Sequence, residues 1–332
     1  MNVKMWINAL NVIPRITKAE WDQLDIISKW LISTRAALLS MTFTAAAIAG
    51  LLAYRDGSFH LGRWILLAIG LVFAHATNNM LNDYTDFRRG VDKDNYFRTQ
   101  YGPQPMQQGL MTSRQTFLYI AVTALISLIA GIPLLVFGGW IAVGLLIAGT
   151  FFLLFYTYPL KYIGLGELTV ILVWGPLMIG GGYYVITGNW DWNTVIASLP
   201  FAFGATTVLF GKHIDKLPFD KAKNIHTFPV IIGERNARFT ALALMALQYL
   251  SIIYLVWIGY FTPAMLIIVV AVIALPTVVR MYLQPKPESM PEGFRQDVWP
   301  LWFSAAAFYH VRYYGAFFML GLVLDILFRK LF

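Results

Sequence analysis

Apolar runs of about twenty residues recur along the whole chain, and their length constrains the fold more than any other feature of the sequence. A helix of about 20 residues is long enough to cross the hydrocarbon core of a bilayer. A transmembrane strand would instead show segments of about ten residues with alternating hydrophobicity, and that pattern does not occur. The runs therefore predict an all-α, polytopic membrane bundle of about nine transmembrane helices. They lie at residues 32–54, 62–81, 115–137, 139–158, 166–187, 194–212, 238–260, 262–283 and 300–328.

Composition agrees with a membrane protein. Of the 332 residues 58% are hydrophobic and 13% are charged, whereas a soluble domain carries about 25% charged residues. We expect one membrane domain over residues 1–332, in which residues 1–30 form a mixed, amphipathic segment in the cytoplasm or on the membrane surface. These first residues lack the apolar core and cleavage site of a signal peptide. The absence of cysteine excludes disulfides, thiolate zinc sites and cysteine nucleophiles.

Basic residues predict the orientation. The net charge is +8, but the lysines and arginines lie in short loops between apolar runs. This position argues against nucleic acid as a partner. Basic residues in such loops instead set the orientation of the chain in the membrane or bind anionic ligands. With the N-terminus in the cytoplasm, 20 of the 25 fall on the cytoplasmic side of the cell membrane and four on the other side. Arg312 falls within the last run. Breaks in the helices are predicted at Pro133, Pro176, residues 180–182 and Pro276.

Polar residues gather where the second run ends. The stretch NNMLNDYTDFRRGVD, residues 78–92, is here called the first acidic motif. Asn78, Asn82 and Asp86 are four residues apart and share one helical face, and Gly90 can turn the chain so that Asp92 follows. Such oxygens are the ligands that Mg²⁺ prefers, together with water and substrate phosphate. Helix capping in a solvated loop explains the cluster equally well when it is taken alone.

A second acidic motif, GKHIDKLPFDKAKNIHTFPVIIGERNAR at residues 211–238, follows the sixth run. Asp215 and Asp220 are separated by Pro218, which breaks the helix between them. A solvated loop again explains alternating charges. The repetition favours a metal, because both motifs follow even-numbered runs on the predicted cytoplasmic side. Two facing carboxylate groups can hold Mg²⁺ against a diphosphate.

The third polar segment is FYTYPLKYIGLGEL, residues 155–168, here called the Tyr–Lys loop. Lys161 is an isolated base in a tight loop, and Tyr156 and Tyr158 lie close to it. A lysine near tyrosines at a membrane boundary is commonly a snorkelling anchor. If the acidic motifs bind a diphosphate, Lys161 is a natural ligand for its oxygens.

The segments NDYTDFRRGVD, YTYPLKYIGLGE and DKLPFDKAKNIHTFPVIIG together resemble the UbiA superfamily of membrane prenyltransferases. The resemblance covers essentially the whole chain. It implies a nine-helix bundle with its active site at the cytoplasmic face, Mg²⁺ as cofactor, and transfer of a polyprenyl group from polyprenyl diphosphate to an aromatic acceptor.

Residue roles follow position by position. The implied metal ligands are Asn82, Asp83, Asp86, Asp92, Asp215 and Asp220. The implied catalytic residues are Lys161, Arg98 and Tyr158, and those expected to bind substrate are Arg35, Asn78, Tyr156, Lys212, Lys223 and Arg312. The second motif departs from the family, because Lys216 stands where its first aspartate aligns. Asn224 and Ile225 replace Gly and Lys, so that Lys223 or His226 would supply the missing cation.

One segment indicates a branch of the family. GPLMIGGGYYVITG, residues 175–188, resembles the fifth span of the 1,4-dihydroxy-2-naphthoate polyprenyltransferases of menaquinone biosynthesis. Other branches use hydroxybenzoate, homogentisate, tetrapyrrole or glycerol phosphate acceptors. Reaction with dihydroxynaphthoate also releases its carboxylate as CO₂, so a cation should meet that carboxylate. Arg312 with His310 is a candidate, because charge within a membrane is costly; an ion pair of Arg312 with Glu167 is the equal alternative.

Some polar side chains allow two interpretations. Tyr156, Tyr158, Tyr183 and Tyr184 can stabilise an allylic cation or simply pack, and packing is favoured for at least two of them. His75 and His213 can be proton acceptors or ligands, or can simply pack; packing is favoured for His75, and the two interpretations are equal for His213, at the start of the second acidic motif. Two other functions are also weighed. A transporter would show inverted repeats and polar residues at mid-membrane, and a non-catalytic binder of prenyl lipids would lack acids of the two motifs.

Overall fold

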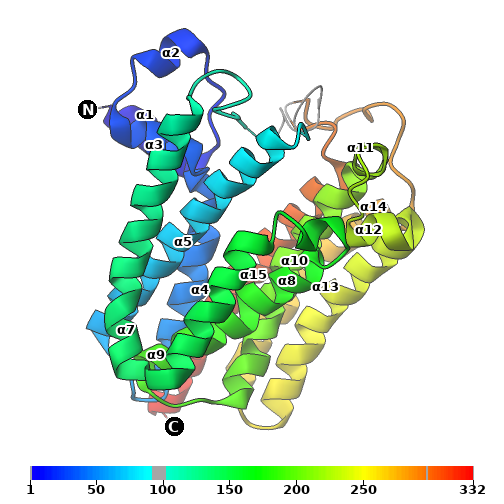
Figure 1. Cartoon of the computed structure of the whole chain (residues 1–332). Coiled ribbons are helices and arrows are strands. Elements are labelled where there is room, and N and C mark those ends of the chain that lie inside the picture. Colours follow the sequence, from blue (N-terminus) through cyan, green and yellow to red (C-terminus); the bar gives the residue numbers. More distant parts are fainter. Residues whose placement is uncertain (1, 92–101, 297, 332) are drawn as a thin grey trace. The chain divides into compact units, whose positions relative to one another are not determined.

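The computed structural model describes residues 2–91, 102–296 and 298–331, and these residues are almost entirely helical (Figure 1). In these ranges no β-strand occurs, although an isolated β-bridge joins Ile163 and His226. Eight helices of the described chain are long and apolar enough to cross a membrane. The predicted all-α, multi-pass membrane fold is confirmed.

The chain divides into two compact units, and the division passes through helix α4. Unit 1 comprises Met1–Ala47 and His60–Tyr158, and unit 2 comprises Ile48–Phe59 and Pro159–Phe332. Unit 1 contains α1 (Val3–Asn11), α2 (Lys18–Asp22), α3 (Ile26–Ser33), the first part of α4 (Ala36–Arg55), α5 (Leu61–Arg88) and α7 (Ser113–Phe155). Unit 2 contains η1 (Leu160–Tyr162), α8 (Gly166–Leu172), η2 (Val173–Gly180), α9 (Gly181–Thr187), α10 (Trp192–Asp215), α11 (Leu217–Ala222), α12 (Phe228–Ile232), α13 (Glu234–Trp257), η3 (Pro263–Ala274), α14 (Leu275–Leu283) and α15 (Trp302–Leu331).

Three short helices fold the N-terminal segment onto unit 1. Asp25 caps α3 through two backbone N–H groups of its first turn, and it also accepts the indole N–H of Trp6 on α1 at 3.0 Å. Hydrogen bonds from backbone amides, first that of Ser28, hold the pKa of Asp25 well below its usual range. Ala9 and Trp21 are buried in a cluster that reaches Ala76 of α5. The amphipathic N-terminal segment is therefore part of the core of unit 1.

Helix α7 has 43 residues, which is the length of two membrane crossings, and it is interrupted at Gly139. Gly139 has φ 55° and ψ −147°, a conformation that needs glycine. Both arms pack on α5. The Arg63 guanidinium lies 4.7 Å from the ring centroid of Phe137, and further along α5 the Asn78 amide donates to the Leu153 carbonyl oxygen at 3.0 Å. With α7 counted as two spans, the described helices match the nine spans predicted.

The breaks in the helices agree only partly with prediction. Pro176 lies in the π-helical segment η2, and Pro276 lies where η3 gives way to α14, as expected. Pro133 was a wrong prediction, because α7 continues through it and departs from helical geometry at Gly139 instead. Neighbouring helices or hydroxyl side chains can satisfy the carbonyl oxygen that a proline frees, whereas the combination of φ 55° and ψ −147° at Gly139 is essentially restricted to glycine.

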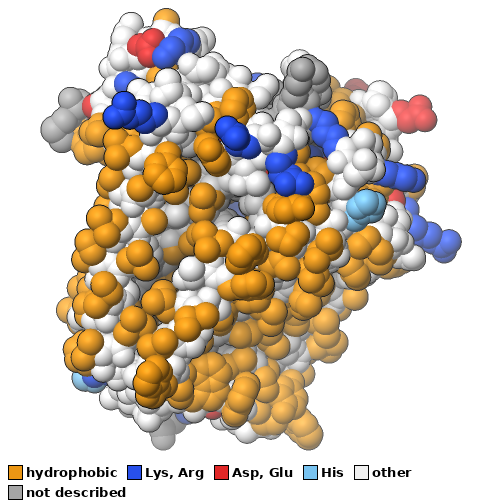
Figure 2. All heavy atoms as spheres, in the orientation of Figure 1, with side chains coloured by type: hydrophobic (Ala, Val, Ile, Leu, Met, Phe, Trp, Pro, Cys, Tyr) orange, Lys and Arg blue, Asp and Glu red, His pale blue; other side chains and the backbone are white. Residues whose placement is uncertain are grey.

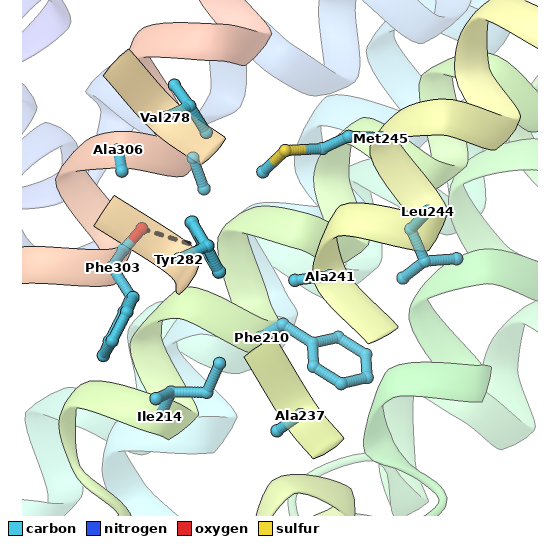
Figure 3. Packing of buried hydrophobic residues seen from close by; sticks show 11 residues of the cluster. Phe210, Ile214, Ala237, Ala241, Leu244, Met245, Val278, Tyr282, Phe303 and Ala306 are labelled. Atoms are coloured by element: carbon cyan, nitrogen blue, oxygen red, sulfur yellow. Dashed lines mark hydrogen bonds between the residues drawn. The ribbon is translucent and has the colours of Figure 1, made fainter. Parts of the chain in front are cut away.

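Unit 2 has its core where α10, α13, α14 and α15 meet (Figure 3). Figure 3 shows Phe210 and Ile214 of α10 facing residues of the other three helices, and the Tyr282 hydroxyl donates to the Phe303 carbonyl oxygen at 3.0 Å. Small residues let the backbones approach, as is usual between membrane helices. Apolar side chains cover the lengths of the helices, and Lys and Arg gather at their ends (Figure 2). Trp140 is 89% exposed, which suits a lipid-facing side chain.

Gly211 sets the distance between α10 and α15. A Cβ at this position would lie 2.6 Å from the Phe303 carbonyl oxygen and 2.7 Å from the Ser304 nitrogen, both backbone atoms that cannot rotate away. We therefore expect Gly211→Ala to destabilise unit 2 by about 2 kcal/mol. Thermal unfolding in detergent would measure the loss. Gly144→Ala is the matched control, since a Cβ there meets nothing within 4 Å; equal melting of the two variants would contradict this packing.

Candidate functional site

Residues 78–88 of the first acidic motif form the last turns of α5, within unit 1. Asn78 and Asn82 share a face, as their spacing predicted, and both meet the second arm of α7 and the residues after it. Asn78 donates to the Leu153 carbonyl oxygen at 3.0 Å, and the Thr157 hydroxyl donates to Asn82 Oδ1 at 3.3 Å. Asp86, four residues beyond Asn82 on the same face, is buried, with 3% of its surface exposed. The end of α5 thus offers oxygen ligands that packing against α7 holds in place.

A buried ion pair occupies the neighbouring face of α5. Asp83 accepts a hydrogen bond from the Arg35 guanidinium, and both side chains are less than 9% exposed. Arg35 separates α3 from α4 and has φ 53°, a left-handed conformation that costs a non-glycine residue about 1 kcal/mol or more. Asn79 fixes the same break through the Thr34 carbonyl oxygen at 2.8 Å. This geometry gives Asp83 a guanidinium as its partner and favours Arg35 and Asp83 as a pair that positions α5.

The end of α5 turns as the sequence predicted. Gly90 has φ 67°, and the N–H groups of Gly90 and Val91 return to the carbonyl oxygens of Phe87 and Asp86 at 3.0 and 2.9 Å. This is the Schellman arrangement that commonly ends helices. Asp92 and Arg98, which the sequence proposes as a metal ligand and as a catalytic cation, lie outside the described residues. Tyr158 is 44% exposed. The Arg89 guanidinium lies over its ring, with the guanidinium carbon 3.6 Å from the ring centroid.

In unit 2 the two aspartates of the second acidic motif have different surroundings. Asp215, at the end of α10, accepts the backbone N–H groups of Trp302, Phe303 and Ser304 at 3.2, 3.0 and 2.9 Å. Both of its oxygens are used to cap α15. The Lys286 ammonium lies 3.9 Å away, and burial lowers the pKa of that lysine while Asp215 partly opposes the shift. Asp215 therefore has a structural task.

Asp220, on α11, keeps one oxygen available. It is 3% exposed, and its Oδ1 pairs with the Lys216 ammonium at 3.1 Å. Its Oδ2 is buried and has no hydrogen-bond partner among the described residues. A buried carboxylate oxygen without a partner is costly, and a divalent cation would satisfy it. Lys212 and Lys223, predicted to bind substrate, are partly buried at the ends of α10 and α11 on either side of it.

No group of three acidic, histidine or cysteine side chains that could hold a metal ion occurs among the described residues. This arrangement still fits Mg²⁺, which binds through one or two carboxylates, retains waters and takes further ligands from phosphate. Asp220 in unit 2 and Asp86 with Asn82 in unit 1 are donors of the required kind.

The Tyr–Lys loop lies against the second acidic motif. Ile163 forms a parallel β-bridge with His226, and a Cβ on Gly164, whose φ is 78°, would lie 2.3 Å from Ile231. Lys161 is in the short helix η1 beside this contact and is partly buried, with its ammonium 5.7 Å from the Tyr162 ring centroid. Unit 2 therefore holds Lys161 close to the chain segment that follows Asp220, which sequence spacing alone could not show.

Glu167 joins three elements of unit 2, and sequence reasoning did not assign it this task. Its Oε1 lies 2.6 Å from His213 Nδ1 on α10, and its Oε2 accepts the Phe228 N–H of α12 at 3.3 Å. It lies at the end of the Tyr–Lys loop, in the first turn of α8. The suggested ion pair of Glu167 with Arg312 was wrong, because His213 is its partner. The sequence signal for this contact was an acidic residue at the start of one apolar run and a histidine at the end of another.

Replacing Glu167 by leucine should loosen this junction. His213 and the Phe228 N–H would lose a buried acceptor, and we expect the free energy of unfolding to fall by about 2 kcal/mol. Glu167→Gln retains one acceptor oxygen and should recover at least half of the loss. Chemical unfolding in mixed micelles, followed by tryptophan fluorescence, would measure both variants. Equal stability of the leucine variant and the unmodified protein would rule out the junction.

Arg312 and His310 do not act together. His310 is fully buried, and its Nε2 lies 3.0 Å from the Tyr249 hydroxyl. Arg312, two residues later on α15, is exposed. The two side chains differ in this way because residues two apart on a helix point in different directions. The pairing of these two side chains predicted from the sequence was therefore wrong.

Three other side chains have packing partners. The Tyr183 hydroxyl donates to Asp56 at 2.9 Å, and the Tyr184 ring lies 6.1 Å from that of Trp190. His75 Nδ1 is 2.6 Å from the Thr42 hydroxyl. These contacts agree with the packing interpretation of the two tyrosines and of His75.

Comparison with known proteins relates these units to one family. A family model described as the UbiA prenyltransferase family matches residues 42–304. The UbiA prenyltransferase domain-containing protein 1 homolog of Drosophila melanogaster is 25% identical over 245 residues, which are 70% of this chain and 66% of that protein. The 1,4-dihydroxy-2-naphthoate octaprenyltransferase of Escherichia coli K12 is 26% identical over 230 residues, which are 65% of this chain and 72% of the enzyme. The chain thus spans about two thirds of the length of these relatives.

Solved structures share the fold. The apo structure of a UbiA homolog from Aeropyrum pernix K1 matches with a TM-score of 0.65 and 16% identity, over 87% of this chain and 98% of that one. A UbiA homolog from Archaeoglobus fulgidus bound to GPP and Mg²⁺ matches with a TM-score of 0.56 and 18% identity, over 88% of this chain and 99% of that one.

Proposed function

Because the chain belongs to the UbiA prenyltransferase family, we propose that it transfers a polyprenyl group from polyprenyl diphosphate to an aromatic acceptor with the help of Mg²⁺. The best candidate acceptor is 1,4-dihydroxy-2-naphthoate, which would place the reaction in menaquinone biosynthesis. The octaprenyltransferase from E. coli carries this acceptor in its name, and the Archaeoglobus homolog was solved with GPP and Mg²⁺. The observation that supports the proposal best is the buried Asp220 carboxylate, whose Oδ2 has no hydrogen-bond partner among the described residues.

The proposed Mg²⁺ ligands are Asp220 in unit 2 and, separately, Asn82, Asp86 and Asp92 in unit 1. When bound, Mg²⁺ would neutralise the charge of the departing diphosphate. Lys161 donates hydrogen bonds to diphosphate oxygens, and Arg98 adds a second cation. The rings of Tyr156 and Tyr158 are the proposed groups that would stabilise positive charge on the allylic carbon. Asp215 and Asp83 would act indirectly, because Asp215 accepts backbone N–H groups of α15 and Asp83 pairs with Arg35.

The reaction that these groups promote balances as follows. The allylic C–O bond of the donor breaks, and its electron pair leaves with the diphosphate. A ring carbon of the acceptor supplies the pair for the new C–C bond. The ring regains aromaticity by releasing CO₂ from dihydroxynaphthoate, or a proton from another phenol. Stabilisation of the departing anion lowers the barrier, and the apolar helices exclude water that would quench the cation.

A reconstituted assay tests the proposal. Purified protein would receive Mg²⁺, a polyprenyl diphosphate and one of three acceptors: dihydroxynaphthoate, hydroxybenzoate or homogentisate. Mass spectrometry should find a prenylated, decarboxylated naphthoquinol that disappears on addition of EDTA. Product from another acceptor would retain the chemistry and change the branch. Absence of product from every acceptor, with folded protein, would refute aromatic prenyl transfer.

The orientation is part of the same proposal. We propose that the protein is a multi-pass protein of the cell membrane with a cytoplasmic N-terminus, because 20 of its 25 lysines and arginines then lie on the cytoplasmic side. Both acidic motifs and the Tyr–Lys loop lie on that side in this topology.

A further inference from the structure

Arg312 lies well inside a membrane-spanning helix. It is ten residues beyond Trp302 on α15, which corresponds to about 15 Å along the axis. Trp302 marks one end of the helix, where Asp215 caps it, and Arg329 and Lys330 mark the other. The bilayer core is about 30 Å thick, so Arg312 is near the middle of the apolar stretch. A charge at this depth is costly and indicates a function.

The described chain supplies no counter-charge for Arg312. Glu167 is engaged by His213 and the Phe228 N–H. Asp325, the acid on the same helix, is fully buried, accepts the Thr262 N–H at 2.6 Å and lies 3.5 Å from Arg329. No ion pair or hydrogen bond of Arg312 occurs among the described residues. Its charge is therefore available to a ligand.

Three partly exposed aromatic residues lie close to Arg312 along α15. Phe308, Tyr309 and Tyr313 are 38%, 42% and 39% exposed, although their neighbours His310 and Tyr314 are buried. The Tyr309 and Tyr313 rings meet edge-on, with centroids 5.0 Å apart. Phe308 and Tyr309 precede Arg312 by four and three residues, the spacings at which side chains are neighbours on a helix surface. Together these residues combine one guanidinium with flat apolar surface.

We propose that Arg312, with Tyr309 and Tyr313, binds the carboxylate of a planar aromatic acid. A single guanidinium matches one carboxylate through two parallel N–H groups, whereas a diphosphate requires several cations. A phospholipid headgroup stays at the membrane surface, about 15 Å away along the helix, but an aromatic acid is apolar enough to enter. If the proposed function holds, this acid is the prenyl acceptor. Only this identification of the ligand rests on the proposed function.

Binding can be measured without turnover. The probes are 1-hydroxy-2-naphthoate and 1-naphthol, which differ by the carboxylate, and their fluorescence would be titrated against protein in nanodiscs of neutral lipid. We expect Arg312→Gln to weaken naphthoate binding about tenfold or more and to leave naphthol binding unchanged. Arg312→Lys should restore part of the affinity. Arg280→Gln is the matched control, an exposed arginine near the end of α14, and should bind like the unmodified protein.

The outcomes separate the inference from the function. Equal naphthoate affinity in Arg312→Gln and the unmodified protein would overturn the inference and indicate an arginine that snorkels to lipid. Equal weakening of both probes would overturn it as well, by indicating a change in packing. In the turnover assay we expect a higher KM for the carboxylated acceptor and an unchanged KM for polyprenyl diphosphate. Selective naphthoate binding by a protein without turnover would support the carboxylate site and refute the proposed function.

Discussion

Asp220→Asn is expected to lower kcat for prenyl transfer by roughly 100-fold or more while the protein remains folded. The side chain is buried, and its Oδ2 has no partner among the described residues, so the wild-type carboxylate is suited to a cation. Asparagine has the same size but no charge, and its Oδ1 can still accept from Lys216. The remaining activity should require a higher Mg²⁺ concentration. Initial rates over a Mg²⁺ titration would show both effects.

The control for Asp220 is Glu288→Gln, which removes an exposed acid from the loop between α14 and α15. This variant should keep its rate and its Mg²⁺ dependence. Thermal unfolding would confirm that Asp220→Asn is folded at the assay temperature. A rate within a factor of about two of the unmodified protein would show that Asp220 is not needed for metal binding.

Asp215→Ala is expected to lower the free energy of unfolding of unit 2 by about 3 kcal/mol, because three backbone N–H groups at the head of α15 lose a charged acceptor. The Lys286 ammonium would also lose its acid at 3.9 Å. Activity should fall because α15 loses its cap, and the Mg²⁺ dependence of the folded fraction should stay the same. Unfolding in mixed micelles, together with the Mg²⁺ titration, would measure both quantities.

Asp215→Asn provides the intermediate case, since an amide keeps one acceptor oxygen for the same backbone groups. We expect it to recover part of the stability lost in the alanine variant. If Asp215→Ala unfolds like the unmodified protein but needs much more Mg²⁺, Asp215 is a metal ligand and its capping is secondary. The two aspartates of the second acidic motif would then act alike, contrary to their different surroundings.

The family and the class of fold could be predicted from the sequence, because both depend on features that are local in the chain. A run of about twenty apolar residues forms a membrane helix wherever it occurs. The shared face of Asn78 and Asn82 follows from helical spacing, and the bend at Gly90 follows from the freedom of glycine at positive φ. The match to the UbiA family over residues 42–304 confirms the resemblance.

Predictions from the sequence were wrong where a side chain's position depends on contacts between segments that are distant in the chain. Periodicity places His310 and Arg312 on one helix, but only the packing of α15 on α13 decides that His310 is buried against Tyr249. In the same way Glu167 met His213 and not Arg312. Pro133 and Gly139 both interrupt helical patterns, and only Gly139 changes direction.

The sequence by itself determined which segments are helices, where acids and bases lie along them, and which family they belong to, because hydrophobic length and residue spacing act over a few turns. Only the tertiary structure decided which acids are free to bind a ligand. Asp215 and Asp220 look alike in the chain, yet one caps α15 and the other keeps a buried oxygen without a partner among the described residues. A hydrogen bond forms over about 3 Å in space, and folding brings residues 215 and 302 within that distance across a separation of 87 positions.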